Sequence, residues 1–224
     1  MLNRLFLVTA ALALAGCSVS RAVKPLPKGS GAMQLSMGGP ISKDLPTPVP
    51  FVVPITTVGY AHGISDRTSV HGAVHPTGLA TFGIFAMDVG ATTLLMEADG
   101  ARPRLMVDGD LIFATGNNAP GDPVGGTRLF PNADLIAAWD VGPHAVYAGV
   151  NQLVQPFPAF RYHATPQIGG MLSTGRVDFQ LEYKWMAPTS NNLITAAEFV
   201  GPFGIGASSI QLGLGIRLGK QEDP

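Results

Sequence analysis

Charged and amide side chains recur at every second position in several runs of this sequence. Within residues 177–185, Asp178, Glu182 and Lys184 alternate with apolar residues such as Leu181. Because successive side chains of an extended chain point to opposite faces, the polar groups of such a run share one face of a strand. The same alternation assigns to that face Asp88, Asp108, Asp110, Asp134, Asp140, Asn151, Arg161, Gln167, Asp178, Glu182, Lys184 and Arg217.

Carboxylates outnumber cations in this set, and two interpretations of the surplus stay open. In an enclosed passage, hydrated carboxylates favour the transit of cations or form a cup for a ligand. In a narrow barrel, the same groups pair with neighbouring donors and form a polar network that fills the interior. We favour the network, because buried carboxylates need cations or donors beside them.

The histidines raise the question of a metal site. A four-residue turn at residues 64–67 pairs Tyr60 with His71 and leaves His75 on the same face. His71 and His75 lie about 13 Å apart along a strand at about 3.3 Å per residue, whereas a shared metal lies about 2 Å from each nitrogen. We therefore predict no metal site and no cofactor.

Catalysis by an envelope enzyme is a further alternative. Membrane-barrel enzymes that modify lipid A use a histidine with a serine or an acid near the bilayer interface, and His163 and Ser190 lie near one end of their predicted strands. No motif links the two residues, and the sequence contains no G-x-S-x-G nucleophile elbow. The glycines of residues 201–209 are not followed by a helix, as a phosphate-binding loop requires. We therefore favour a role without enzymatic activity, and an envelope enzyme stays open as an alternative.

The composition favours a membrane barrel over a soluble domain. Lys, Arg, Asp and Glu make up 13% of the 224 residues, whereas soluble domains average roughly 25%. The 28 glycines and 19 prolines argue against long helices. A net charge of −1 gives no reason to expect nucleic acid as a partner.

Ten strands are predicted, at residues 32–41, 52–63, 68–75, 86–97, 102–115, 129–141, 144–155, 162–173, 176–187 and 204–218. Most reach the roughly 9 to 11 residues that a tilted membrane strand requires. Short and long gaps alternate between them, as in transmembrane barrels with short turns on one side and long loops on the other. We predict an all-β fold, an antiparallel up-and-down transmembrane β-barrel of about 10 strands.

Two hairpins are expected to keep like residues together. In one, Asp134 faces Asn151, and in the other Gln167 faces Glu182, across turns of two residues.

Aromatic girdles are typical of the rims of membrane barrels. The predicted rims carry Phe113, Trp139, Tyr162, Tyr183 and Trp185.

The N-terminus resembles the signal sequence of bacterial lipoproteins. Arg4 precedes an apolar run, residues 5–14, which has the length of a signal-peptide core and is too short to cross a bilayer as a helix. The run ends in Leu-Ala-Gly-Cys, which looks like a lipobox. The resemblance implies cleavage after Gly16, diacylglycerol on Cys17, and, because Ser18 is not Asp, sorting to the outer membrane. An ordinary secretory signal with a chance cysteine is the alternative.

The C-terminal strand carries a second resemblance. The stretch "QLGLGIRL", which ends at Leu218, is similar to the terminal-strand signal that the barrel-assembly machinery recognises, although a six-residue tail replaces the usual final aromatic residue. This stretch, "HAVYAGVNQLV" and "FQLEYKWMAP" together resemble sequences of small outer-membrane β-barrel lipoproteins of bacteria. The resemblance covers most of the mature chain. That resemblance implies a location and a shape, and no particular activity.

The expected organisation is a signal peptide (1–16), a lipidated tether (17–31), the barrel (32–218) and a tail (219–224), with both termini in the periplasm. The expected function is that of a lipid-anchored integral outer-membrane barrel with a structural or interaction role. Its expected partners are the outer-membrane bilayer and the lipoprotein-processing and barrel-assembly machineries, and the sequence does not indicate an oligomeric state. The alternatives are a small cation-favouring passage, an envelope lipid-modifying enzyme, and a soluble lipidated carrier of the lipocalin type.

Overall fold

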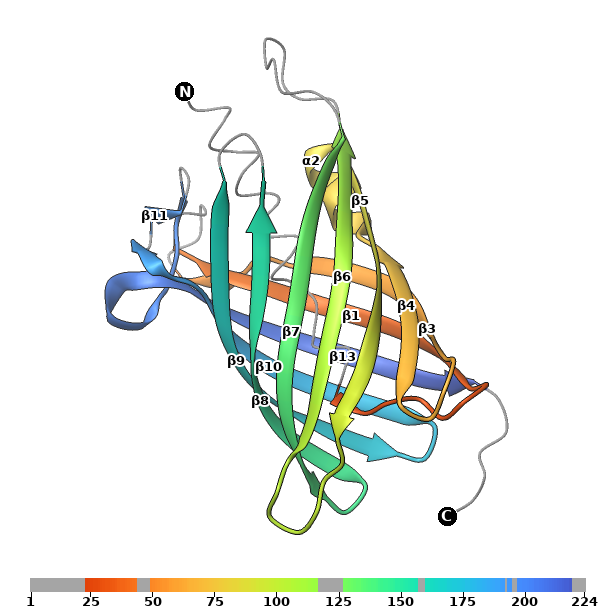
Figure 1. Ribbon diagram of the computed structural model, residues 1–224. Coiled ribbons are helices and arrows are strands. Elements are labelled where there is room, and N and C mark those ends of the chain that lie inside the picture. The colour runs from red at the N-terminus through yellow and green to blue at the C-terminus, as the bar shows by residue number, and fades with distance from the viewer. Residues whose placement is uncertain are drawn as a thin grey trace.

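A computed structural model describes residues 23–43, 49–116, 127–156, 160–191, 193–194 and 197–218. Ten long antiparallel strands form a closed barrel (Figure 1). They are β1 (Gly31–Ser42), β3 (Ile55–Gly63), β4 (Thr68–Val74), β5 (Ile84–Met96), β6 (Arg104–Gly116), β7 (Arg128–Val141), β8 (His144–Gln155), β9 (Arg161–Thr174), β10 (Val177–Asn191) and β13 (Ile205–Leu218). Pairing of β1 with β13, from Gly31 with Leu218 to Pro40 with Ser209, closes the barrel. The predicted all-β fold of about ten up-and-down strands is confirmed.

The connections differ between the two ends of the barrel (Figure 1). Short connections, residues 64–67, 97–103, 142–143 and 175–176, define what we call the turn end. The other connections define the loop end, and three of them carry short elements, namely β2 (Phe51–Val52), α2 (Pro76–Phe82), and β11 (Leu193–Ile194) with β12 (Ala197–Glu198) and η2 (Pro202–Gly204). Helix α2 begins with a proline and ends at Phe82. Gly83 caps it with a φ of 64°, the left-handed conformation typical of the residue after a helix. No helix in the described part of the chain is long and apolar enough to span a bilayer.

The two faces of the wall differ in polarity. On β10, the side chains of Phe179 and Leu181 point outward and are 50% and 57% exposed, whereas Glu182 and Lys184 point inward and are 0% and 2% exposed. The alternation predicted for this strand is therefore present, with the apolar face outside and the polar face inside. A period of two requires this separation once one face is enclosed.

The β7–β8 hairpin has the predicted register, in which Asp134 pairs with Asn151. The β9–β10 register differs from the prediction, because Lys184 instead of Glu182 pairs with Gln167. The turn occupies residues 175–176, one residue later than expected, and Gly175 takes the first central position with a φ of 63°. Tight hairpin turns favour glycine in that conformation.

The predicted pairing of Tyr60 with His71 is wrong. His71 pairs with Ala61, because the carbonyl of Thr68 accepts hydrogen bonds from the backbone N–H groups of Ile64 and Ser65 and lengthens the turn by one residue. A slip of one residue reverses the relation between faces. Tyr60 therefore lies on the exposed outer face, while His71 is buried inside.

Candidate functional site: the barrel lumen

Two histidines and two aspartates form a chain of contacts in the lumen. His75 Nε2 lies 2.8 Å from Asp88 Oδ2, and His71 Nε2 lies 2.8 Å from Asp108 Oδ1. His71 Nδ1 lies 4.0 Å from Asp88 Oδ1, so this ring stands between the two carboxylates. The hydroxyl of Thr92 donates to Asp108 Oδ1 at 2.5 Å. Of these buried residues, the sequence assigned only the aspartates to the polar network; the histidines lie on the same inward-facing alternation and were missed.

Amide side chains hold the next two carboxylates. Asn132 Nδ2 donates to Asp110 Oδ2 at 3.0 Å, and Asn151 Nδ2 donates to Asn132 Oδ1 at 2.8 Å. Asp134 accepts hydrogen bonds from Asn151 at 3.1 Å and from Gln167 Nε2 at 2.9 Å. The structure thus joins four of the predicted residues through Asn132, which the sequence analysis did not single out.

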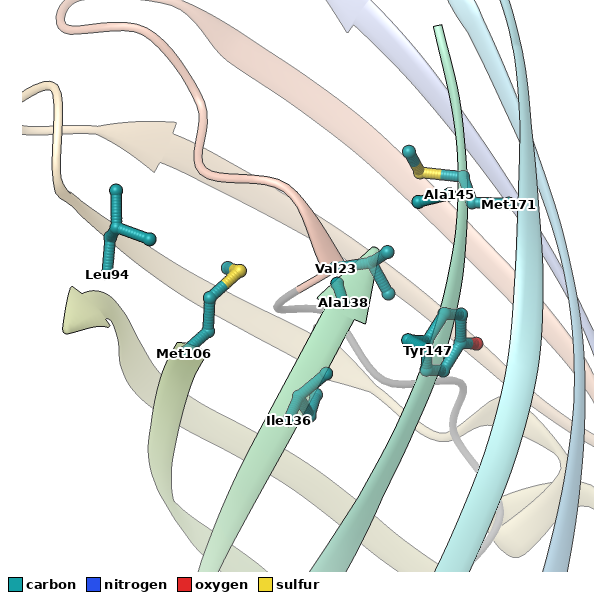
Figure 2. Packing of buried hydrophobic residues seen from close by; sticks show 8 residues of the cluster. All are labelled: Val23, Leu94, Met106, Ile136, Ala138, Ala145, Tyr147 and Met171. Atoms are coloured by element: carbon teal, nitrogen blue, oxygen red, sulfur yellow. The ribbon is translucent and has the colours of Figure 1, made fainter. Parts of the chain in front are cut away.

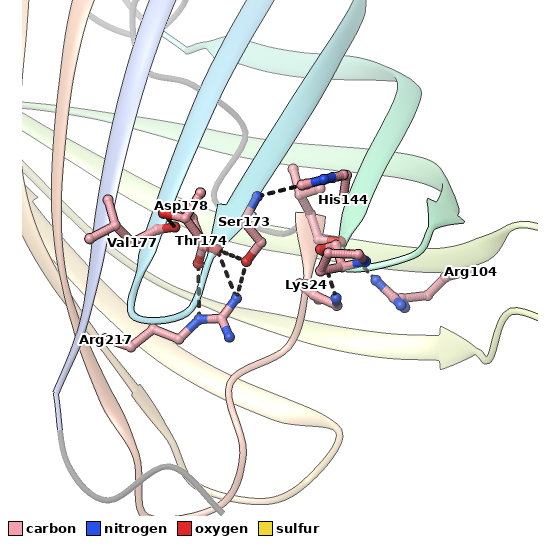
Figure 3. Close-up of polar contacts among 10 residues, drawn as sticks. Lys24, Arg104, His144, Ser173, Thr174, Val177, Asp178 and Arg217 are labelled. Carbon is pink, nitrogen blue, oxygen red and sulfur yellow. Dashed lines mark hydrogen bonds and ion pairs between the residues drawn. The ribbon is translucent and has the colours of Figure 1, made fainter. Parts of the chain in front are cut away.

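The remaining predicted residues lie on β10 and β13. Lys184 Nζ lies 3.2 Å from Glu182 Oε1, and both side chains are buried. Nearer the turn end, Arg217 forms two hydrogen bonds with the carboxylate of Asp178, at 2.8 and 3.0 Å, and one with Ser173 Oγ at 3.0 Å (Figure 3). A paired-fork contact of this kind fixes both side chains in the wall.

Two charged residues assigned to the polar face have more open surroundings. Asp140 is exposed, although its Oδ2 lies 2.5 Å from Nη2 of the buried Arg104. Arg161, at the loop end of β9, is exposed. The inner polar contacts described above join neighbouring or next-but-one strands, so they run along the wall and do not reach across the barrel.

Residues 23–30 lie at the turn end against the inner wall. Val23 is 1% exposed and shares an apolar cluster with residues from five strands (Figure 2), namely Leu94, Met106, Ile136, Ala138, Ala145, Tyr147 and Met171. Residues 23–30 belong to the predicted tether. The first part of that tether, residues 17–22 with Cys17, lies outside the described part of the chain, as do the predicted signal peptide and tail. The burial of Val23 could not be read from the sequence, because its partners come from strands distant along the chain.

Hydrogen bonds hold this segment along its length. Arg104 Nη1 donates to the carbonyl of Val23 at 3.1 Å, and the backbone N–H of Leu26 donates to Ser69 Oγ at 3.2 Å. Gly63 donates to the carbonyl of Ser30 at 2.9 Å. A Cβ at Gly63 would lie 2.2 Å from the carbonyl oxygen of Pro27, so the segment depends on the absence of a side chain there.

Among the described residues, no group of three or more His, Cys, Asp or Glu side chains is arranged to hold a metal ion. The contacts described above give the lumen hydrogen bonds and ion pairs.

A closed antiparallel barrel with an apolar exterior and a polar interior is the fold of outer-membrane β-barrel proteins. No family model matches the chain. No curated protein matches it either.

Two solved structures have a similar fold. The translocator domain of the autotransporter NalP from Neisseria meningitidis has a TM-score of 0.51 and 10% identity, over 96% of this chain and 97% of that chain. An outer membrane channel from Pseudomonas putida F1 has a TM-score of 0.51 and 9% identity, over 89% of this chain and 99% of that chain. Identities this low show a shared fold alone.

Proposed function

We propose that this protein is a lipid-anchored barrel of the bacterial outer membrane, with a closed lumen and a structural or interaction role. The observation that carries the proposal is the polarity of the wall. Large apolar side chains are exposed on the outside of many strands, among them Leu35, Val58, Val89, Leu135, Ile168 and Leu212. A soluble protein rarely exposes so continuous an apolar surface, which suits the hydrocarbon of a bilayer. This arrangement also argues against the soluble lipocalin-type carrier, whose apolar side chains would face inward.

The proposed lipid on Cys17 fits a barrel whose turn end faces the periplasm. Val23 lies six residues after Cys17 along the chain. At about 3.3 to 3.6 Å per residue, these six steps span at most about 22 Å. Because Val23 lies at the turn end, an acyl anchor on Cys17 would hold that end close to the inner leaflet.

Residues 23–30 support a closed lumen. Val23 is buried in the apolar cluster, and the backbone of the segment bonds to β3 and β4. The carboxylates of Asp108, Asp134 and Glu182 in the lumen have histidine, amide and lysine partners. Because the protein itself supplies these partners, the buried charges depend less on water for stabilisation. We therefore expect little or no ion conduction.

A small cation-favouring passage is the second candidate. The contacts of Asp88, Asp108 and Asp134 described above run along the wall and are made with histidine, threonine and amide side chains. A surplus of carboxylates around a hydrated space attracts cations. This candidate requires residues 23–30 to leave the turn end.

The proposal is tested on the mature protein purified from membranes. We expect it to resist extraction by alkaline carbonate, to migrate faster on gels before heating than after, and to give no single-channel steps in planar bilayers. Release by carbonate with no heat-dependent shift would contradict the membrane barrel. Reproducible cation-selective steps from folded protein would contradict the closed lumen and support the passage.

A further inference from the structure

A cavity of about 340 Å³ lies at the turn end, between residues 23–27 and the inner wall. Strands β1, β3, β4, β5, β6, β9, β10 and β13 contribute to its lining. Its volume falls within the roughly 300 to 1,000 Å³ of small-molecule sites. The cavity therefore has the size of a binding site, and it borders the apolar cluster around Tyr147, with which it shares Val23, Leu94 and Met171.

The charges around the cavity balance. Apart from His71, its lining carries three cations and three carboxylates, namely Lys24, Arg104, Arg217, Asp66, Glu97 and Asp178. Arg217 is paired with Asp178, and Arg104 is paired with Asp140 outside the lining. The other three, Lys24, Asp66 and Glu97, carry both signs of charge. A charged ligand would therefore break one of the two ion pairs or be repelled by a like charge in the same lining, and both are costly. The lining therefore favours a neutral ligand.

The uncharged polar groups are hydroxyls and amides. Ser36, Thr57, Ser69, Thr92 and Gln34 all line the cavity. The carbonyl oxygen Oε1 of Gln34 is buried and accepts no hydrogen bond from the described residues. A buried acceptor without a partner is unfavourable, so a donor from a bound molecule would stabilise it. The lining hydroxyls already have protein partners: Ser36 and Thr57 bond to each other, Ser69 accepts from Leu26, and Thr92 donates to Asp108. A hydroxyl has one donor and two acceptor positions, so each can also bond to a ligand, and a ligand rich in hydroxyls is complementary to this lining.

Apolar side chains complete the site. Ala61, Leu94 and Met171 lie in the same lining and offer a surface for the C–H groups of a ligand. We propose that the turn-end cavity binds a small, neutral, polyhydroxylated solute of the mono- or disaccharide class. Residues 23–27 form one wall of the site, so the bound solute also holds this segment in place. The site does not depend on whether the barrel conducts ions.

The test measures binding of glucose and maltose to the full mature protein in lipid nanodiscs by titration calorimetry. We expect saturable binding of at least one of these sugars, with glucose 6-phosphate and glucosamine binding at least tenfold more weakly. Gln34→Leu is expected to weaken binding at least tenfold. Gln152→Leu is the matched control, because Gln152 contacts Tyr162 and does not line the cavity, and it is expected to bind as the unmodified protein does.

A second variant fills the cavity from another strand. Ala61 is buried in the lining, and Ala61→Leu is expected to abolish sugar binding while the barrel keeps its heat-dependent gel shift. The sugar is also expected to slow tryptic cleavage after Lys28 in the unmodified protein. The proposal is overturned by absence of saturable binding, by tighter binding of a charged probe, or by full binding in folded Gln34→Leu or Ala61→Leu protein.

Discussion

At the scale of single residues, the direction of a side chain decides whether a charge is tolerated. Leu181 is 57% exposed on the outer face of β10, several residues from either end of the strand. In the proposed orientation, Leu181→Arg places a charge near the middle of the bilayer and is expected to lower the unfolding free energy by about 2 to 4 kcal/mol. Urea unfolding in lipid vesicles measures this change.

Leu218→Arg is the matched control for that substitution. Leu218 is also exposed but ends β13 at the turn end, where a charge would meet the bilayer interface. Its expected cost is about 0 to 1 kcal/mol. Equal effects of the two substitutions would show that the outer face does not meet hydrocarbon.

The buried pair of Glu182 and Lys184 gives a second prediction. Lys184→Met leaves the buried Glu182 without this cation and is expected to cost about 3 to 5 kcal/mol of unfolding free energy. Adding Glu182→Gln to that variant is expected to restore at least half of the loss. Lys43→Met serves as the control, because its ion pair with Glu198 is exposed at the loop end and is worth about 1 kcal/mol or less. A loss in Lys184→Met no larger than in the control would contradict the pairing.

At the scale of elements, residues 23–30 depend on a glycine in β3. Gly63→Ala introduces a Cβ 2.2 Å from the carbonyl oxygen of Pro27 and 2.7 Å from that of Leu26, so the segment has to move away. We expect faster tryptic cleavage after Lys28. Gly109→Ala is the control, because a Cβ there has no neighbour within 4 Å. Equal cleavage rates in the two variants would show that the segment is not held against β3.

The strands were predictable because a period of two is a strong signal when one face is apolar. Residues 177–185 are an example, and the β7–β8 register followed from a two-residue turn. Turn geometry was harder to predict, since one additional residue before Ser69 changed the partner of His71. Residues 23–30 have no periodic pattern, and only contacts with strands far along the chain give them a position.

The sequence predicted which polar side chains face inward, but it did not predict which of them bond to each other. The sequence placed Gln167 and Glu182 opposite each other, whereas Gln167 donates to Asp134 two strands away. Such contacts depend on wall curvature and side-chain length, which a strand-by-strand alternation does not specify.

At the scale of the whole molecule, the acyl anchor and the barrel contribute separately to membrane attachment. Cys17→Ser is expected to abolish acyl labelling and to leave an uncleaved precursor. The barrel is expected to stay in the membrane fraction, because a lipid anchor binds far more weakly than a spanning structure. Acyl groups absent from the unmodified mature protein would contradict lipidation, and loss of the variant from membranes would contradict the spanning barrel.

The central claim is that the apolar face of the wall meets lipid while the polar face is enclosed. Because Cys17 is the only cysteine, nitroxide labels can be placed by Leu181→Cys or Glu182→Cys in a Cys17→Ser background. The most direct measurement is the collision rate of each label with oxygen, which dissolves in lipid, and with a water-soluble nickel chelate. We predict that a label at position 181 collides frequently with oxygen and rarely with nickel, and that a label at 182 is shielded from both. A lipid-exposed label at 182, or a label at 181 that collides mainly with nickel, would contradict the account.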